Sequence, residues 1–160
     1  MPRRVKSVSR EIRAAIGELV IEVTFMQYLA ARLVAVAGIT DNEMSLLQPG
    51  SKPFKLAREA TRTFKDPQVA GRTRSWLREA EELERQRHKV VRSIVLHTHR
   101  AGLSMYHPRS GSMVRRTTRE VVELAAKACK HAEDGNYMSI FDWPSALGLA
   151  GPHKVGDESG

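Results

Sequence analysis

The chain of 160 residues has a hydrophobic fraction of 41% and a charged fraction of 28%, which is typical of one globular domain with a modest core. It lacks both a run of about 18 uninterrupted apolar residues and a signal-peptide pattern, and its single Cys129 excludes an internal disulfide, so we expect a cytoplasmic protein without a membrane span. The net charge of +8 favours a polyanionic partner, with nucleic acid ahead of an anionic membrane surface.

The first predicted helix runs from about Arg10 to Ala37, because apolar residues recur at every third or fourth position. Ser9 is the expected N-cap and Gly38 the expected stop. After a loop rich in helix breakers, a short helix is expected to begin near Pro53, whose ring suits a first helical position. The predicted buried face of this short helix consists of Phe54, Ala57, Ala60 or Thr61, and Phe64.

A long third helix is predicted from Pro67 to about Arg100, with Asp66 as its cap and Gly102 as its stop. Its apolar stripe is interrupted by one charged residue, Arg87. The stripe consists of Trp76, Ala80, Leu83, Arg87, Val90 or Val91, Ile94 and, at its edge, His97. A cation that never loses its proton therefore lies in the middle of the face that this helix needs to bury.

A polar loop is expected next, and Thr117 with Glu120 matches a capping box that opens a fourth helix to about Ala132. The inward positions of this helix are Val121, Leu124 or Ala125, Ala128 and Ala132. Residues 137–143 are expected to pack as an arm, and the last ten residues are expected to be disordered.

Taken together, these elements predict an all-α fold, an up-and-down bundle of about four helices with a partly ordered C-terminal arm. We divide the chain into a helical bundle domain, residues 1–134, and a C-terminal arm with a flexible tail, residues 135–160. Within residues 135–160, Lys154 is set against Asp142, Asp157 and Glu158. The net charge of this segment is therefore −2. Because the whole chain has a net charge of +8, residues 1–134 carry +10.

Arg87 has three possible environments, because burying an unpaired guanidinium is costly. Its side chain could extend along the surface of the bundle to water, or it could pair with Glu18 or Glu22 of the first helix. Alternatively, the stripe could open there into a cleft or a second subunit where an anion such as a phosphate binds. The third environment is favoured by the basic residues nearby, which are Arg85, His88, Lys89, Arg92, His97, His99 and Arg100.

The stretch "AEELERQRHKVVRSIV" resembles the end of the third helix in HEPN domains, a group of helical nucleotide-binding and ribonuclease domains. Their pattern is Arg, a polar residue, three to five further residues and His. Arg87 and His88 match its first two positions, but Arg92 stands where His is expected. In a second register Arg92 and His97 are separated by four residues, with Ser93 as a weaker polar match. The resemblance covers about residues 10–133.

This resemblance implies RNA binding and, in active members, metal-independent RNA cleavage by a dimer belonging to a defence or toxin–antitoxin system. His97 would carry the proton, Arg87 and Arg92 would hold the scissile phosphate, and His88 would be the alternative proton carrier. If the first register is the true one, the protein is an inactive binding module. The resemblance also leaves room for an inhibitory protein partner. Further nucleic-acid contacts are predicted at Arg85, Lys89, His99, Arg100, Arg109, Arg115 and Arg116.

The alternative function is a non-catalytic helical binding or assembly module that uses the same basic face for nucleic acid or an acidic protein. Neither a cofactor nor a metal is expected, because His97 and His99 point about 200° apart on a helix and cannot share an ion unless the helix has ended there. No cysteine pair or close carboxylate completes a site with them and His107. The loop "HPRSGSMVRR" is either a phosphate-contacting loop or a plain connector. Cys129 is interpreted as a packed core thiol.

Overall fold

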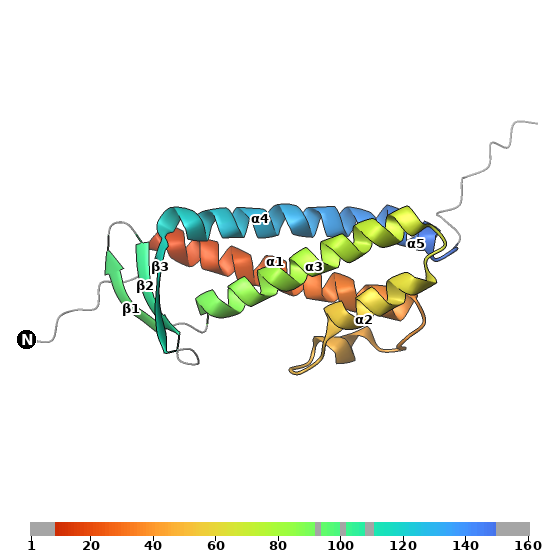
Figure 1. Cartoon of the computed structure of the whole chain (residues 1–160), viewed down its shortest axis with the longest axis horizontal. Helices are drawn as coiled ribbons and strands as arrows, with labels where there is room; N and C mark the ends of the chain where they lie inside the picture. Colours follow the sequence, from red (N-terminus) through yellow and green to blue (C-terminus); the bar gives the residue numbers. More distant parts are fainter. Residues whose placement is uncertain (1–8, 92–93, 100–101, 108–110, 150–160) are drawn as a thin grey trace, which may run out of the picture. The chain divides into compact units, whose positions relative to one another are not determined.

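A computed structural model of the chain describes residues 9–91, 94–99, 102–107 and 111–149, without the side chains of residues 94–107 and 112–114 (Figure 1). Four helices of eight or more residues confirm the predicted helical-bundle class; they are α1 (Arg10–Val36), α2 (Pro53–Ala60), α3 (Pro67–Val91) and α4 (Thr118–Tyr137). The tail from residue 150 onward, predicted to be disordered, lies outside the described residues.

The chain forms two compact units, and each combines segments that are distant in the sequence. Unit 1 contains Met1–Met26 and Glu79–Glu133, and unit 2 contains Gln27–Arg78 and Asp134–Gly160. This division differs from the predicted one, because unit 2 joins the C-terminal residues to the middle of the chain.

Both ends of α1 are capped as the sequence predicts. The Ile12 N–H donates to Oγ of Ser9 at 3.2 Å, and Gly38 ends the helix with a φ of 76°, in the left-handed region that favours glycine. Buried side chains follow the predicted spacing and are Ile12, Ala15, Leu19, Val23, Met26, Leu29, Ala30, Ala31, Leu33 and Val34. By length and composition alone α1 could also cross a membrane, a test that the core helix of a bundle passes equally.

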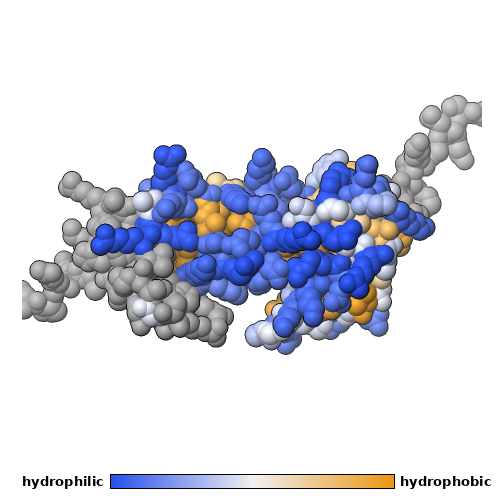
Figure 2. Space-filling view, in the orientation of Figure 1, coloured by the Kyte–Doolittle hydropathy of each residue, from blue (hydrophilic) through white to orange (hydrophobic). Residues whose placement is uncertain are grey.

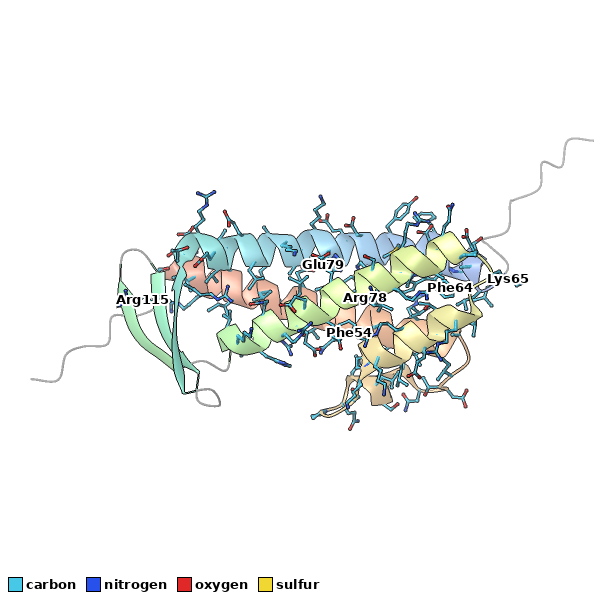
Figure 3. The ribbon with its side chains drawn as sticks, in the orientation of Figure 1. Phe54, Phe64, Lys65, Arg78, Glu79 and Arg115 are labelled. Atoms are coloured by element: carbon cyan, nitrogen blue, oxygen red, sulfur yellow. The ribbon has the colours of Figure 1, made fainter. Side chains whose placement is uncertain are left out.

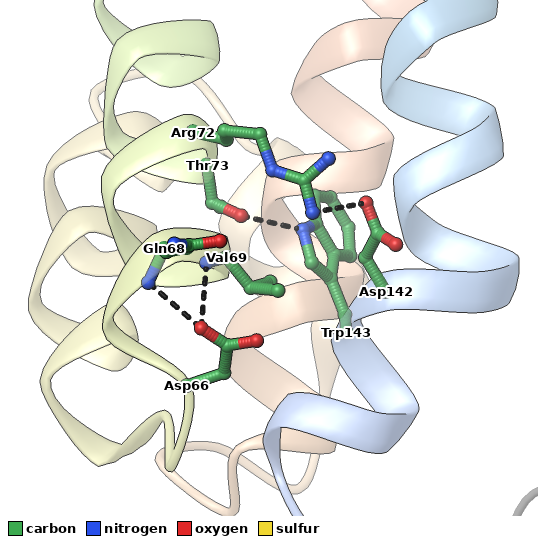
Figure 4. A network of polar contacts seen from close by, with 7 residues as sticks. All are labelled: Asp66, Gln68, Val69, Arg72, Thr73, Asp142 and Trp143. Atoms are coloured by element: carbon green, nitrogen blue, oxygen red, sulfur yellow. Dashed lines mark hydrogen bonds and ion pairs between the residues drawn. The ribbon is translucent and has the colours of Figure 1, made fainter.

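In unit 2, a short 3-10 helix, Glu43–Leu47, precedes α2, and a second, Thr61–Thr63, continues it. The predicted apolar face of α2 is confirmed for Phe54, Ala57, Ala60 and Thr61, which are buried, whereas Phe64 is half-buried. Asp66 caps α3 as predicted, because its Oδ1 accepts from the backbone N–H of Gln68 at 2.8 Å and of Val69 at 3.3 Å (Figure 4).

Two tryptophans form the centre of unit 2. The rings of Trp76 and Trp143 meet edge to face with their centroids 5.9 Å apart, and Nε1 of Trp143 donates to Oγ1 of the fully buried Thr73 at 3.0 Å (Figure 4). Gly135 makes room for this pair, because a Cβ added there would lie 2.2 Å from Cζ2 of Trp76. The end of α4 therefore depends on a glycine that the sequence alone does not mark.

The predicted C-terminal arm is helical rather than extended. After α4 the chain makes a π-helical turn, Met138–Asp142, and a last short helix, α5 (Trp143–Ala146). Within the predicted arm only Met138 and Trp143 are buried, whereas Tyr137, Ile140 and Phe141 are exposed. The arm thus packs through two side chains at helical spacing and leaves its other aromatic rings at the surface.

The third helix ends earlier than predicted, at Val91, and the residues that follow form a three-stranded antiparallel sheet. Its strands are β1 (Ile94–His99), β2 (Gly102–His107) and β3 (Ser112–Thr117). Here strand pairing overrides the helical spacing, and the β-branched Ile94 and Val95 suit a strand. The predicted extension to Arg100 and the polar loop expected after it are therefore wrong, and Gly111, with a φ of 64°, lies in the β2–β3 turn.

The sheet leads directly into α4, and the predicted capping box is confirmed at this junction. The Thr117 N–H donates to Oε2 of Glu120 at 2.6 Å, and the Glu120 N–H donates to Oγ1 of Thr117 at 3.1 Å. The inward face of α4 is also as predicted, with Val121, Ala125, Ala128 and Ala132 buried and Leu124 half-buried.

Candidate nucleic-acid interface

Arg87 lies where the sequence places it, in the apolar seam of the C-terminal half of α3. Its neighbours at helical spacing, Leu83 and Val90, are 2% and 3% exposed, whereas Arg87 itself is half-buried. The Nε atom of Arg87 is buried and has no hydrogen-bond partner among the described atoms. Among the described residues no ion pair joins Arg87 to Glu18 or Glu22, so the second of its three possible environments does not form.

The guanidinium of Arg87 contacts the imidazole of the next residue. Nη2 of Arg87 lies 2.6 Å from Nε2 of His88, which is half-buried. Since arginine offers only donors, Nε2 of His88 accepts this hydrogen bond, and the ring is therefore unprotonated at that nitrogen. The structure thus brings together two of the four predicted catalytic residues.

A second arginine with a buried, unpartnered Nε atom, Arg116, lies on β3 of the same unit. It connects the sheet to α3, because its Nη2 donates to Oε1 of Gln86 at 2.7 Å. Gln86 in turn donates to Oε1 of Glu82 at 2.7 Å, and Oε2 of Glu82 pairs with Arg85 at 2.8 Å. Two predicted contact residues, Arg85 and Arg116, are therefore linked through an amide and a carboxylate that sequence reasoning missed.

Only some of the other predicted catalytic and nucleic-acid-binding residues lie in the described part of the chain. Arg115 on β3 and Lys89 on α3 are exposed (Figure 3). His97 and His99 lie on β1, opposite Ser104 and Gly102 of β2, and not on α3 as predicted. Arg92, Arg100 and Arg109 lie outside the described residues.

An open groove of about 480 Å³ lies between α3 and α4 in unit 1. It is lined by Glu82, Leu83, Gln86, Arg116, Glu120, Glu123, Leu124 and Lys127. Its cations are already engaged, since Lys127 pairs with Glu79 at 2.6 Å, and Arg116 bonds Gln86. Arg87 does not line this groove, so the groove is not the cleft expected around Arg87.

Hydrogen bonds at the rim of the groove shift the pKa values of two side chains, Glu79 and Arg119. The hydrogen bond from Lys127 lowers the pKa of Glu79, and the smaller effect of burial opposes it. The hydrogen bond to Glu123 raises the pKa of Arg119, which stays charged in any case. Both ion pairs are exposed to solvent, so each contributes little to the stability of unit 1.

Cys129 is half-buried and not the packed core thiol that the sequence predicts. Its Sγ donates to Oε1 of Glu133 at 3.9 Å. Burial, followed by the charges of Glu22, Glu133 and Glu18, raises the pKa of this thiol. Burial, followed by the charges of Glu18 and Glu133, also raises the pKa of Glu22, so this side of unit 1 disfavours negative charge and with it the thiolate form of Cys129.

Among the described residues no group of three or more His, Cys, Asp or Glu side chains is arranged to hold a metal ion. Comparison with known proteins identifies no relative, since neither a family model, nor a curated protein, nor a solved structure matches the chain.

Proposed function

We propose that the chain binds RNA at the C-terminal end of α3, with Arg87 as a phosphate contact. The supporting observation is a permanent cation in an apolar seam whose Nε atom is buried without a partner. A buried donor left unsatisfied costs about 1–3 kcal/mol, and phosphate oxygens would satisfy it with charge-assisted hydrogen bonds. The exposed Arg115 and Lys89 in the same unit add charge that attracts a polyanion.

Metal-independent cleavage of the bound RNA is the second candidate function, and the contact between Arg87 and His88 favours it. These two residues match the first two positions of the HEPN pattern. In the proposed step a neutral imidazole takes the proton of the 2′-hydroxyl, O2′ attacks the adjacent phosphorus, and the 5′ oxygen leaves with a proton from an acid. The products are a 2′,3′-cyclic phosphate and a 5′-hydroxyl. His97 is the proposed proton carrier, and His88 is the alternative one once Nε2 has exchanged its contact with Arg87 for one with the RNA. Arg87 with Arg92 stabilises the charge that builds on the phosphate.

The biological setting belongs to the same proposal and comes from the resemblance alone. We place the chain in the cytoplasm as a homodimer, in which two copies supply two Arg87–His88 pairs to one RNA, within a defence or toxin–antitoxin system with an inhibitory protein partner. If cleavage is absent, the chain is a binding or assembly module for nucleic acid or an acidic protein.

Replacing Arg87 by methionine tests RNA binding. Methionine keeps much of the length of the side chain and removes the charge, so R87M should lower the affinity for a fluorescein-labelled RNA about tenfold, measured by anisotropy. The unfolding free energy should stay the same or rise, because a half-buried guanidinium with an unsatisfied Nε atom is replaced by an apolar group. The control is R13M, which removes an exposed charge from α1 of unit 1 and should change the affinity less than about threefold. Equal losses in the two variants would contradict a specific role for Arg87.

Cleavage is tested separately, with end-labelled RNA in the presence of a chelator. The wild type should produce fragments ending in a 2′,3′-cyclic phosphate, and H97A or H88A should abolish them while retaining RNA binding. A strand with deoxyribose at every position should bind without being cut, because it lacks the nucleophile. Intact RNA after incubation with the wild type would contradict the proposed ribonuclease activity and would favour the non-catalytic binding module.

A further inference from the structure

A second basic surface lies in unit 2, in a part of the sequence with no resemblance to a catalytic motif. Residues 52–78 contain eight Lys and Arg residues and only two carboxylates, Glu59 and Asp66. This stretch includes α2, its 3-10 extension and the first half of α3. Figure 2 shows hydrophilic residues gathered over α2 and the adjoining part of α3.

Most of these cations are exposed and have no acidic partner. Lys52, Lys55, Arg62, Lys65 and Arg78 are exposed, and none of them forms an ion pair with a described carboxylate. Lys52, Lys55 and Arg62 are three and seven residues apart, which puts them on one side of α2 and its extension. Their charges are therefore available to a ligand, unlike that of Arg85 in unit 1.

The three other arginines of this stretch are already engaged. Arg72 lies 3.6 Å from Asp142 (Figure 4), and Nε of Arg74 donates to the backbone oxygen of Ala70 at 3.2 Å. Arg58 is half-buried and has an interaction partner of its own. None of the three belongs to the proposed surface.

The backbone beneath these cations is held in place. The N–H of Lys65, in the turn between α2 and α3, donates to the backbone oxygen of Ala146 at 2.8 Å, and its ammonium lies beside Gly148 of the chain that follows α5 (Figure 3). The buried Phe54 anchors α2, and the Asp66 cap begins α3 directly after the turn. The surface is therefore organised before a ligand arrives, which reduces the entropy cost of binding.

The composition of the surface indicates what it binds. No large hydrophobic side chain is exposed among residues 52–78. Of the three aromatic residues in this stretch, Phe54 and Trp76 are buried and Phe64 is half-buried. A single-strand binder stacks bases on exposed rings, and a membrane-surface helix inserts apolar side chains. Double-stranded nucleic acid needs neither, because its bases are paired inside and its phosphates face outward.

We propose that Lys52, Lys55, Arg62, Lys65 and Arg78 bind the phosphate backbone of a double-stranded segment of RNA. The proposal rests on the proposed function in taking RNA as the ligand, but it names a separate surface and the duplex as the form recognised. Because the contacts are to phosphates, binding is independent of base sequence and strongly dependent on salt.

The test is a triple variant, K55Q, R62Q and K65Q, with binding to a 20-base-pair RNA duplex measured by anisotropy over a series of NaCl concentrations. Each phosphate contact contributes about 0.9 to the slope of log K against log salt, so we expect the slope to fall by about 2–3. The affinity at low salt should fall at least about 30-fold. A thermal melt equal to that of the wild type establishes that the variant is folded.

The matched control removes three exposed cations of α1, as R10Q, R13Q and R32Q, with the same loss of net charge. It should leave the slope within about 1 of the wild type. Equal slopes for the two triple variants would overturn the proposed surface while leaving RNA binding to be decided by R87M. A wild type that binds no RNA would overturn both proposals. The proposal would also fail if K55Q/R62Q/K65Q weakened binding to vesicles of one part anionic to three parts neutral lipid and left duplex binding unchanged.

Discussion

Helical cations of units 1 and 2 differ in how many of them have an acidic partner. In unit 1 three cations of α3 and α4 form ion pairs, whereas in unit 2 most of the cations between Lys52 and Arg78 have no acidic partner in the described part of the chain. The paired groups of unit 1 are Arg85 and Glu82 at 2.8 Å, Arg119 and Glu123 at 2.6 Å, and Lys127 and Glu79 at 2.6 Å.

The cores of the two units also differ. Unit 2 contains a buried tryptophan pair and a buried hydrogen bond from Trp143 to Thr73. The core of unit 1 consists of aliphatic side chains and alanines, and a hydrogen bond from Arg116 to Gln86 connects its sheet to α3. The cation that points to a ligand in unit 1 is the half-buried Arg87, whereas in unit 2 it is the set of exposed cations between Lys52 and Arg78.

The largest effect should come from adding one methyl group to the core of unit 2. In G135A the new Cβ would overlap the Trp76 ring, and we expect a loss of about 3 kcal/mol in unfolding free energy, measured by urea denaturation. The control is G71A on α3, where no atom lies within 4 Å of the added Cβ. This variant should gain about 0.5–1 kcal/mol from helix propensity. A stable G135A would mean that the tryptophan pair does not hold unit 2.

A smaller loss is expected from removing the buried hydrogen bond of the same core. T73V keeps the shape of the side chain but leaves Nε1 of Trp143 without an acceptor, which should cost about 1–2 kcal/mol. T73S, which restores the hydroxyl, should recover part of this loss. Near-ultraviolet circular dichroism should report the change at the tryptophans. An unchanged spectrum together with unchanged stability would mean that the hydrogen bond from Trp143 to Thr73 does not stabilise unit 2.

The smallest effect should come from an exposed ion pair of unit 1. The folded-state pKa of Glu79 is lowered, so its contribution to stability is present above the unfolded-state pKa and is lost as pH falls through the folded-state value. Because the Glu79 and Lys127 side chains are 44% and 58% exposed, solvent screening limits E79Q to a loss of about 0.2–1 kcal/mol at pH 7. Urea denaturation should show a smaller difference at pH 3 than at pH 7, whereas a difference that does not shrink as the pH falls would contradict an electrostatic origin.

Much of the helical framework can be predicted from the sequence, because local chemistry specifies where a helix begins and ends. Ser9, Asp66 and the Thr117–Glu120 pair cap the helices that they are predicted to cap, and Gly38 ends α1. The place of Arg87 in the seam is equally local, since it follows from the spacing to Leu83 and Val90. The sheet could not be predicted in this way, because strand pairing between residues 94 and 117 is not encoded by helical periodicity.

The sequence by itself determined the long helices, their caps, the basic character of the chain and the charged interruption of the third helix, because each depends on residues a few positions apart. Only the tertiary structure decided the rest. It ended α3 at Val91, set Arg87 against His88 without a carboxylate, and brought Arg116 to Gln86 across 30 positions. It also decided which cations are paired, such as Arg85 and Lys127, and which are not, such as Lys55 and Arg62, because pairing depends on which carboxylates come near once the chain has folded.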